Sequence, residues 1–362
     1  MLRDSGYGGV LYKGEREGVQ TSYGAWFCPI QRILKNNVDN RIVMAFGYRD
    51  LEEAIVSAVR DGVSGKEIGV AFSGGLDSGL VSALAKRFAR AVHLYTCGTS
   101  NAYDVVMARD LSERLGLPWT HVQLSRGNIE RYIHDMISAT GTSDPFTVSY
   151  ELQLFSVCEA ATEDIVLTGQ GSDEYFMGCA KFVGQSRDNF EALKDASVER
   201  LLDVSVPCEM KIAEHFGKTL VYPYLDPRVT SEVGRIDPEA LIPRDMDSRK
   251  SVLKEVALHL GYPCLLERKK KSSQYGSGTT DLVRAVSREK GMMYNEYIAS
   301  VYDEIFNGIP FSGRGSVINA RVDSVLKEKA ERIIAECGSN PSAVMDIVYR
   351  RILKDGDLRS LK

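Results

Sequence analysis

The sequence predicts an α/β fold, a doubly wound parallel sheet followed by a mainly helical second half. Short buried-strand patterns alternate with helical patterns from Leu51 to about residue 171. A glycine-rich turn at residues 73–78 joins the first of these strands to its helix. Beyond residue 190 the apolar spacing is helical. Strands that alternate with helices in this way are typical of a parallel sheet with helices on its faces.

Each element follows from its own pattern of apolar residues. Helices are predicted where these residues recur every three or four positions, and strands where short apolar runs are bounded by turns. The predicted strands cover residues 68–72, 92–98, 119–125 and 164–171. The predicted helices start at Leu51 and then cover residues 79–90, 103–116, 129–139 and 151–161. Because crossovers between parallel strands are right-handed, the loops after the strands gather at one edge, where open α/β sheets bind ligands.

The second half is predicted to be helical around one turn and one loop. Helical patterns cover residues 188–204, 207–217, 317–337 and 341–353. Prolines mark a turn at residues 222–229, and a lysine-rich loop covers residues 267–278. We therefore expect a short N-terminal segment over 1–50, a main domain over 51–290 and a C-terminal helical extension over 291–362.

Composition excludes several classes of protein. The 362 residues are 44% hydrophobic and 26% charged, and the formal net charge is −4, which argues against a nucleic-acid or acidic-membrane partner. The N-terminus lacks the basic start and apolar run of a secretory signal, and no apolar stretch reaches the length of a membrane span. The seven cysteines are scattered, without a CxxC pair. These features favour a reduced, cytoplasmic protein without structural zinc.

The glycine-rich turn, SGGLDS, has the chemistry of a phosphate site. Gly74 and Gly75 let the backbone approach an anion, and the N-terminus of the next helix presents N–H groups to it. Ser73 and Ser78 add hydroxyl donors, and Asp77 is placed to hold Mg²⁺ beside the phosphates. The turn is not a Walker A loop, because no Lys-Ser/Thr pair closes it. A bare glycine turn with a serine cap is the structural alternative.

This turn resembles the PP-motif of the ATP-pyrophosphatase superfamily, whose fold is that of the adenine nucleotide alpha hydrolases. Three later motifs narrow the resemblance to the synthetase domain of asparagine synthetase. TGQGSDE at 168–174 resembles the family loop SGEGxDE, and PYLD at 223–226 resembles its PFLD turn. Lys250 matches the lysine that begins its KxxL helix, and Arg268 and Lys270 resemble the RxK…G loop. The motifs agree in order over residues 50–290.

The resemblance implies ATP and Mg²⁺ as cofactors and assigns roles to single residues. The residues that would bind ATP are Ser73, Gly74, Gly75, Asp77, Ser78, Cys97, Gly98, Asp104, Gly169, Arg268 and Lys270. Asp77 and Asp173 would hold the metal, although Asp173 is also placed to cap a helix. At Cys97, Gly98 and Asp104 a structural role is the equal alternative, and Cys97 has no neighbouring histidine to make it a nucleophile.

Lys250 is the residue that the resemblance implies for catalysis. A fixed ammonium group would stabilise the charge that develops on the transferring phosphates. The alternative is an ordinary solvated lysine on a helix. The basic run at residues 268–271 is either a lid over pyrophosphate or a solvated, nucleic-acid-like patch.

Two departures from the family pattern bear on the reaction. The glutamine-dependent members begin with a catalytic cysteine in a glutaminase domain, whereas residue 2 here is Leu2, the first cysteine is Cys28, and about 50 residues precede the sheet. Nitrogen would then come from free ammonia, an amine or a partner protein. Gln170 stands where the family has a glutamate, and a neutral amide cannot act as a general base. Glu174 is the nearest acidic substitute in sequence.

The leading function is therefore ATP-dependent adenylation of a carboxylate, aspartate by default, followed by amide formation as in asparagine biosynthesis. One alternative is a PP-loop enzyme that modifies tRNA, although no CxxC pair or separate RNA-binding domain is visible. Another is a non-catalytic nucleotide-binding regulator, against which the presence of Asp77, Asp173 and Lys250 argues. The C-terminal helices would either cover the site or form a homodimer interface.

Overall fold

The structure, a computed structural model, describes residues 47–267, 276–308, 321–336 and 340–356. The chain divides into two units at Gly47, and the first unit lies outside the described residues apart from Gly47 itself. The predictions for residues 1–46, and those for Arg268 and Lys270, fall outside the described ranges. Every described helix and strand belongs to the unit from Tyr48 onward.

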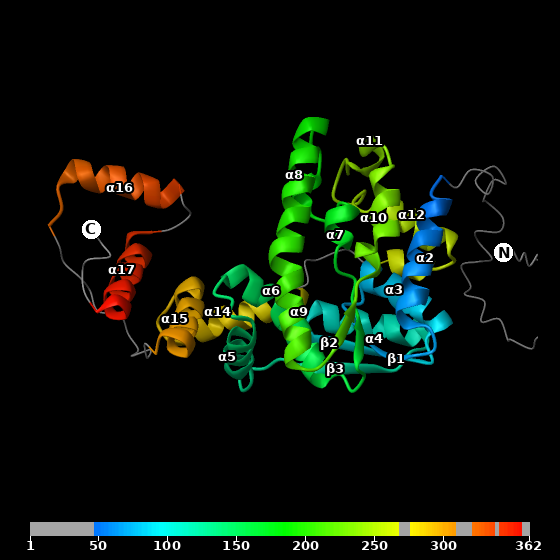
Figure 1. Ribbon diagram of the computed structural model, residues 1–362, viewed down its shortest axis with the longest axis horizontal. Helices are drawn as coiled ribbons and strands as arrows, with labels where there is room; N and C mark the ends of the chain where they lie inside the picture. Colours follow the sequence, from blue (N-terminus) through cyan, green and yellow to red (C-terminus); the bar gives the residue numbers. More distant parts are fainter. Residues whose placement is uncertain (1–46, 268–275, 309–320, 337–339, 357–362) are drawn as a thin grey trace, which may run out of the picture. The chain divides into compact units, whose positions relative to one another are not determined.

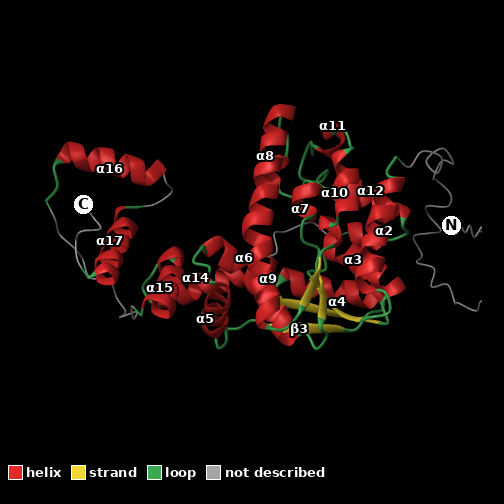
Figure 2. Cartoon of the chain, in the orientation of Figure 1, coloured by secondary structure: helices red, strands yellow, loops and turns green. Residues whose placement is uncertain are grey.

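Five strands form one parallel sheet in the order β3-β2-β1-β4-β5 (Figure 2). The strands are β1 (Glu67–Ala71), β2 (Ala91–Gly98), β3 (Trp119–Gln123), β4 (Ile165–Leu167) and β5 (Thr219–Val221). In register, Val70 pairs with Leu94 of β2 and with Leu167 of β4. The strand order reverses between β1 and β4, which makes the edge beyond these two strands the switch point where such sheets bind ligands.

Helices connect and cover the strands (Figure 1). In the first half they are α2 (Arg49–Val63), α3 (Leu76–Phe88), α4 (Tyr103–Leu115), α5 (Ile129–Thr140), α6 (Pro145–Ala160) and α7 (Ser172–Tyr175). The second half contains α8 (Arg187–Arg200), α9 (Val206–His215), α10 (Pro227–Gly234), α11 (Pro238–Leu241), α12 (Ser251–His259), α14 (Thr279–Glu289), α15 (Tyr294–Asn307), α16 (Ser324–Glu336) and α17 (Pro341–Asp355). Short 3₁₀ segments lie at Ala180–Phe182, Pro223–Leu225 and Pro263–Leu266, and a π-helical turn at Leu201–Ser205 joins α8 to α9.

The predicted doubly wound α/β fold with a helical second half is confirmed. Helices α3 and α4 contact β1, β2 and β3, whereas α5, α6, α9, α14 and α15 share a core with residues of β2, β3 and β4. Tyr95 and Cys97, two positions apart on β2, belong to that core, as the period of a strand requires. No helix of the described part is both long and apolar enough to cross a bilayer.

Several predicted boundaries were wrong. The helix predicted from residue 151 begins at Pro145, because Asp144 caps it by accepting a hydrogen bond from the Thr147 N–H, and proline is favoured in a first turn. The strand predicted over 164–171 ends at Leu167. The turn predicted over 222–229 becomes helix α10 from Pro227 onward. Strand β5 was missed, since three apolar residues are too short a run to show a period.

Candidate active site

A cavity of about 660 Å³ opens at the carboxyl ends of β1, β2 and β4. Its walls come from the loops after β1 and β4, from the end of β2 and from helices α6, α9 and α12. The predicted site residues that line it are Ser73, Gly75, Asp77, Ser78, Cys97, Asp104, Gly169, Gln170, Asp173 and Lys250. The remaining described site residues, Gly74, Gly98 and Glu174, are not among its lining residues.

The loop after β1 combines a tight turn with a helix N-terminus that faces the cavity. Gly74 has φ +67°, and a Cβ there would lie 2.6 Å from the backbone of Ala108 on α4, so only glycine fits. The backbone N–H of Ser73 donates to Oγ of Ser78 over 3.2 Å, which closes the turn. Gly75 is the N-cap of α3 and has no capping side chain. The first-turn N–H groups of this helix are therefore available to an anion.

The loop after β4 packs closely on the first loop. A Cβ on Gly169 would lie 3.0 Å from the backbone nitrogen of Ser78. Gly171 has φ +88° and is the N-cap of α7, so the predicted capping alternative for Asp173 was wrong. The PYLD turn supports both loops: the Tyr224 hydroxyl donates to the Asp77 carbonyl over 3.1 Å, and Leu225 fills the space beside Gly171.

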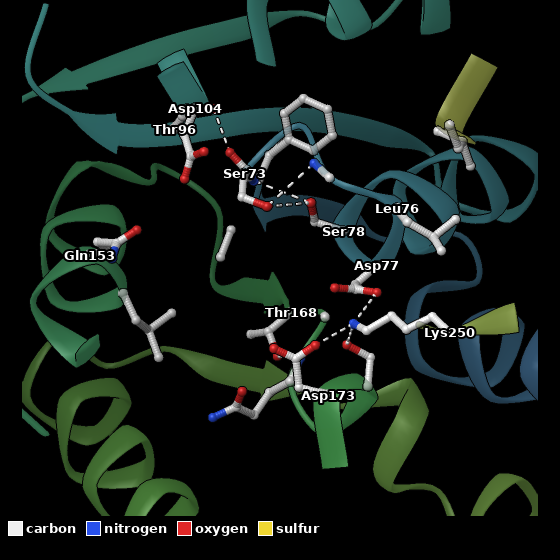
Figure 3. Close-up of a pocket in the computed structure, with 18 of the residues that line it drawn as sticks. Ser73, Leu76, Asp77, Ser78, Thr96, Asp104, Gln153, Thr168, Asp173 and Lys250 are labelled. Atoms are coloured by element: carbon white, nitrogen blue, oxygen red, sulfur yellow. Dashed lines mark hydrogen bonds and ion pairs between the residues drawn. The ribbon is translucent and has the colours of Figure 1, made fainter. Parts of the chain in front are cut away.

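Lys250 joins the two loops by ion pairs (Figure 3). Its Nζ lies 2.5 Å from Oδ1 of Asp77 and 2.6 Å from Oδ1 of Asp173, and it donates to Oγ of Ser172 over 2.9 Å. The lysine side chain is 3% exposed, whereas the two carboxylates are 23% and 28% exposed toward the cavity. Burial alone would lower the pKa of Lys250, but Asp173 and Asp77 outweigh it and raise this pKa above its usual range.

The alternative of a solvated helix lysine at position 250 is therefore wrong. Lys250 lies at the start of α12, where the resemblance placed it, as the N-cap; with φ +56° it adopts the left-handed conformation that non-glycine residues seldom occupy. Such strain persists only where surrounding contacts hold it, and here the three polar contacts of the ammonium group do so. The neighbouring cations Arg249 and Lys254 also line the cavity.

Three further predicted site residues lie on two neighbouring elements. Cys97 and Gly98 lie at the end of β2, and Asp104 lies in the first turn of α4. Cys97 is 5% exposed, and burial raises its pKa to about 12, which keeps the thiol protonated. Gly98 packs where a Cβ would lie 2.9 Å from the carbonyl oxygen of Ser277. Asp104 is buried in the first turn of α4, against Gly276. Of these, Cys97 and Asp104 line the cavity.

A second acidic region lies on the α6 and α9 side of the cavity. Gln170 donates from Nε2 to Oε1 of Glu209 over 2.6 Å and accepts at Oε1 from the Tyr150 hydroxyl over 3.3 Å. Glu209 and Glu151 are 3% and 2% exposed. Burial, followed by the charge of Glu209, raises the pKa of Glu151 well above its usual range, and burial raises the pKa of Glu209 to about 8.

Sequence reasoning missed Glu151 and Glu209. One signal for Glu151 was present: it stands in the apolar run YELQLFSVC, where a charged residue is out of place on a buried helix. Glu209 lies in the mixed segment PCEMKIAEHF and has no comparable signal. Within the described ranges, no group of three or more His, Cys, Asp or Glu side chains is arranged to hold a metal by protein ligands alone.

The parallel sheet, with two glycine-rich loops at its switch point, defines a doubly wound α/β protein. Residues 50–207, a little under half of the chain, match the family model for asparagine synthase. The chain is 27% identical over 283 residues to a putative glutamine-hydrolyzing asparagine synthetase of Methanocaldococcus jannaschii, covering 67% of this chain and 51% of the relative. It is 24% identical over 243 residues to asparagine synthetase B of Escherichia coli, covering 61% and 42%. The chain thus spans about half the length of these curated relatives.

Similar solved structures include two synthetases. An NMN synthetase from Francisella tularensis is 16% identical with a TM-score of 0.34, covering 74% of this chain and 89% of its own. An NH3-dependent NAD synthetase from Campylobacter jejuni is also 16% identical, with a TM-score of 0.28, covering 63% and 99%. Likeness at this level has no bearing on the reaction.

Proposed function

We propose that the chain uses ATP to adenylate a carboxylate and that ammonia or an amine then displaces AMP to form an amide. The observation that carries the proposal is the cluster in which Lys250 joins Asp77 and Asp173. These carboxylates come from the loops after β1 and β4, on the two sides of the switch point. The asparagine synthase domain match supports the same reaction class.

In the first step a carboxylate oxygen attacks the α-phosphorus, and the bond from that phosphorus to the bridging oxygen breaks as pyrophosphate leaves. Backbone N–H groups at the start of α3 and the hydroxyls of Ser73 and Ser78 would hold the phosphates. Lys250, with Arg249 and Lys254 nearby, would offset the charge that develops on the leaving pyrophosphate.

The carboxylates of Asp77 and Asp173 suit magnesium. This ion takes one or two protein carboxylates and completes its shell with phosphate oxygens and water, and both side chains are partly exposed to the cavity. Magnesium bound there would screen the negative charge of the phosphates. Cys97, Asp104 and Gly169 would lie along the nucleotide, whereas Gly74 and Gly98 would act through packing.

Aspartate is the carboxylate that we propose first, in line with the names of the relatives. Those relatives are named as glutamine-hydrolyzing, so a nitrogen-donor protein or domain is part of the proposal. Gln170 cannot remove a proton from the nucleophile, and Glu174, which is not a cavity-lining residue, acts electrostatically on Glu151 and Glu209.

The test is an assay of pyrophosphate and AMP release from ATP and Mg²⁺ with aspartate and ammonium. We expect equal amounts of both products, an amide in the mass spectrum, and loss of all three in Asp77→Ala. Asp61→Ala, which alters an exposed carboxylate on α2, is the matched control and should retain activity. ATP binding without pyrophosphate release across a panel of carboxylates would overturn the proposal in favour of a nucleotide-binding regulator.

A further inference from the structure

The carboxyl groups of Glu151 and Glu209 form a buried pair that the phosphate chemistry does not use. Glu151 projects from α6 and Glu209 from α9, two helices that pack together. Both side chains line the cavity although each is more than nine-tenths buried. In the part of the chain that the structure describes, Oε1 of Glu151, Oε2 of Glu209 and the hydroxyl of Tyr222, which acts on Glu209, have no partner at hydrogen-bonding geometry. Buried polar groups without partners are rare, because each loses its hydration without compensation.

The electrostatics of this pair match a single positive charge. Two carboxyl groups in contact in a buried site do not both ionise, so the pair holds at least one proton, and a cation bound beside it would favour ionisation of the other group. An ammonium group supplies one positive charge and three N–H donors, which would satisfy the unpartnered oxygens. The oriented amide of Gln170 fixes the other oxygen of Glu209 and ties the pair to the loop that bears Asp173.

We propose that Glu151 and Glu209 bind the protonated form of the nitrogen nucleophile, ammonium or a primary alkylammonium, and that Glu209 accepts its proton. The inference rests on the proposed function, and it assigns to this pair the base that Gln170 cannot provide. The ammonium group first transfers one proton to the Glu209 carboxylate. The freed nitrogen lone pair then forms a bond to the acyl carbon, the bond from that carbon to the AMP oxygen breaks with its electron pair, and the second nitrogen proton leaves to water.

The first test separates adenylation from amide formation in Glu209→Gln. ATP–pyrophosphate exchange needs only the carboxylate substrate, so we expect it to stay within about threefold of wild type. Amide formation from ammonium should fall by about 100-fold or more, the usual contribution of a general base. Hydroxylamine, which is uncharged at neutral pH, should still give hydroxamate at near the wild-type rate. Glu159→Gln, on the exposed side of α6, is the matched control.

The ammonium group that the pair binds has a second candidate source, namely the α-ammonium group of an amino-acid substrate. If Glu209→Gln loses exchange as severely as amide formation, the pair binds that substrate and the proposal is wrong. Unchanged amide formation would also overturn it. Glu151→Gln is the second variant, should Glu209→Gln not fold: we expect its KM for ammonium to rise about tenfold with exchange unchanged.

A binding measurement separates this inference from the proposed function. At constant ionic strength, methylammonium chloride should raise the Tm of the wild-type chain above its value in sodium chloride, and this difference should vanish in Glu209→Gln. A methylammonium effect without any pyrophosphate exchange would leave the cation site standing and the adenylation refuted. Exchange without a methylammonium effect would refute the site alone.

Discussion

Two acidic regions face the same cavity and differ in how their charge is balanced. Asp77 and Asp173 are partly exposed and share the ammonium group of Lys250. Glu151 and Glu209 are almost fully buried, and in the described residues each has an oxygen without a hydrogen-bond partner. Burial raises the pKa of both glutamates. A built-in cation offsets part of the charge of the first region, whereas protonation reduces the charge of the second.

This difference separates the expected roles of the two regions. A carboxylate that is paired with lysine and partly exposed to the cavity is placed to act as a ligand for a cation. A buried pair without a cation changes its protonation near neutral pH, which suits proton transfer. Acidic residues that line the same cavity can therefore serve different ligands.

The largest effect is expected from Lys250→Met. This change leaves Asp77 and Asp173 facing each other without a counter-ion, and it removes the cation beside the phosphates. We expect ATP–pyrophosphate exchange to fall by about 10³-fold or more, in line with the loss of a preorganised charge. Lys86→Met, which removes a lysine bonded to the Leu115 carbonyl, should leave exchange unchanged. If both variants lost exchange activity to a similar extent, Lys250 would be no different in role from a structural lysine.

Asp173→Asn should have the next largest effect. The amide keeps the shape of the side chain but loses its charge, so magnesium affinity should fall while Lys250 keeps Asp77 as its partner. We expect exchange to fall about 100-fold at a fixed magnesium concentration and to recover partly as magnesium is raised. A magnesium titration of both proteins gives the answer. An unchanged midpoint would exclude Asp173 as a ligand.

Glu209→Gln should alter the pH dependence of stability. The folded-state pKa of about 8 lies above the ordinary value of 4.5, so this group stabilises the fold fully below pH 4.5 and loses that contribution as pH rises through 8. The charged or titratable groups that act on the pair are Glu151, Glu174, Tyr150, Tyr222, Cys158, Cys208 and Arg200.

Glutamine does not titrate, and therefore the drop in Tm between pH 5 and pH 8.5 should be smaller in Glu209→Gln than in wild type, by a few degrees. Thermal unfolding at both pH values measures this. Glu159→Gln serves as the control, because the Arg131 guanidinium lowers the pKa of Glu159 and both pH values of the experiment lie above it. Equal drops in all three proteins would mean that Glu209 is ionised throughout.

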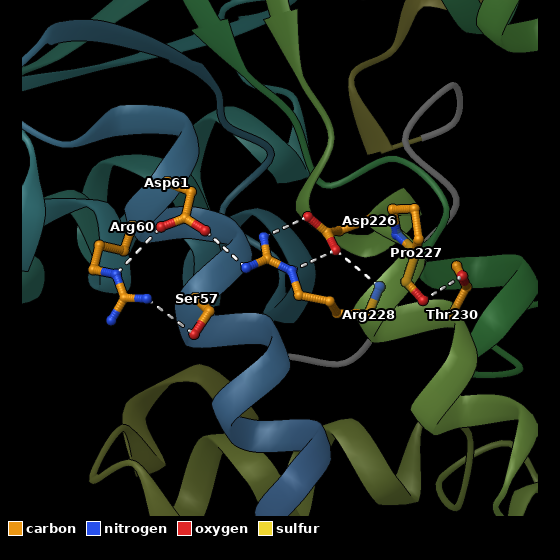
Figure 4. Close-up of polar contacts among 7 residues, drawn as sticks. All are labelled: Ser57, Arg60, Asp61, Asp226, Pro227, Arg228 and Thr230. Carbon is orange, nitrogen blue, oxygen red and sulfur yellow. Dashed lines mark hydrogen bonds and ion pairs between the residues drawn. The ribbon is translucent and has the colours of Figure 1, made fainter. Parts of the chain in front are cut away.

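The smallest effect is expected from Arg228→Ala, at a surface cluster of arginine–aspartate ion pairs (Figure 4). Arg228 pairs with Asp61 of α2 and with Asp226, the N-cap of α10, over 2.7 Å each. The guanidinium and Asp61 are about half exposed, at 46% and 51%. Because water screens such pairs, we expect only a small decrease of the urea denaturation midpoint. If Arg228→Ala lost as much stability as the loss of a buried ion pair, burial would not explain the difference between the two acidic regions of the cavity.

Local signals in the sequence were sufficient for much of the fold. The alternation of strand and helix patterns predicted β1 to β4 in order, and the helix predicted to end at Gly116 does end there, with Gly116 as a left-handed C-cap. The segment SGGLDS was placed correctly between β1 and α3. Such features depend on neighbours within a few positions, which is why they can be read from one segment at a time.

The roles of the candidate site residues remain predictions. Their positions fall into two groups: residues that lie together in one loop, and residues that only the folding of distant segments brings together. Ser73, Asp77 and Ser78 lie in one loop and were found from that loop alone. The contact of Lys250 with Asp77 spans 173 positions, and no local pattern distinguishes it from a solvated lysine. Only the motif resemblance singled it out.

The class of fold and the loop that suits a phosphate are predictable from the amino-acid pattern, because both arise from the spacing of apolar residues and the conformational freedom of glycine. The burial of charges and the partners that they meet arise only when distant segments pack together. Lys250 gains two carboxylates only when the β1 and β4 loops adjoin, and Glu151 meets Glu209 only when α6 packs on α9. The charge balance of a cavity depends on the local dielectric constant and on the distances between charged groups, and no single segment of the sequence determines either.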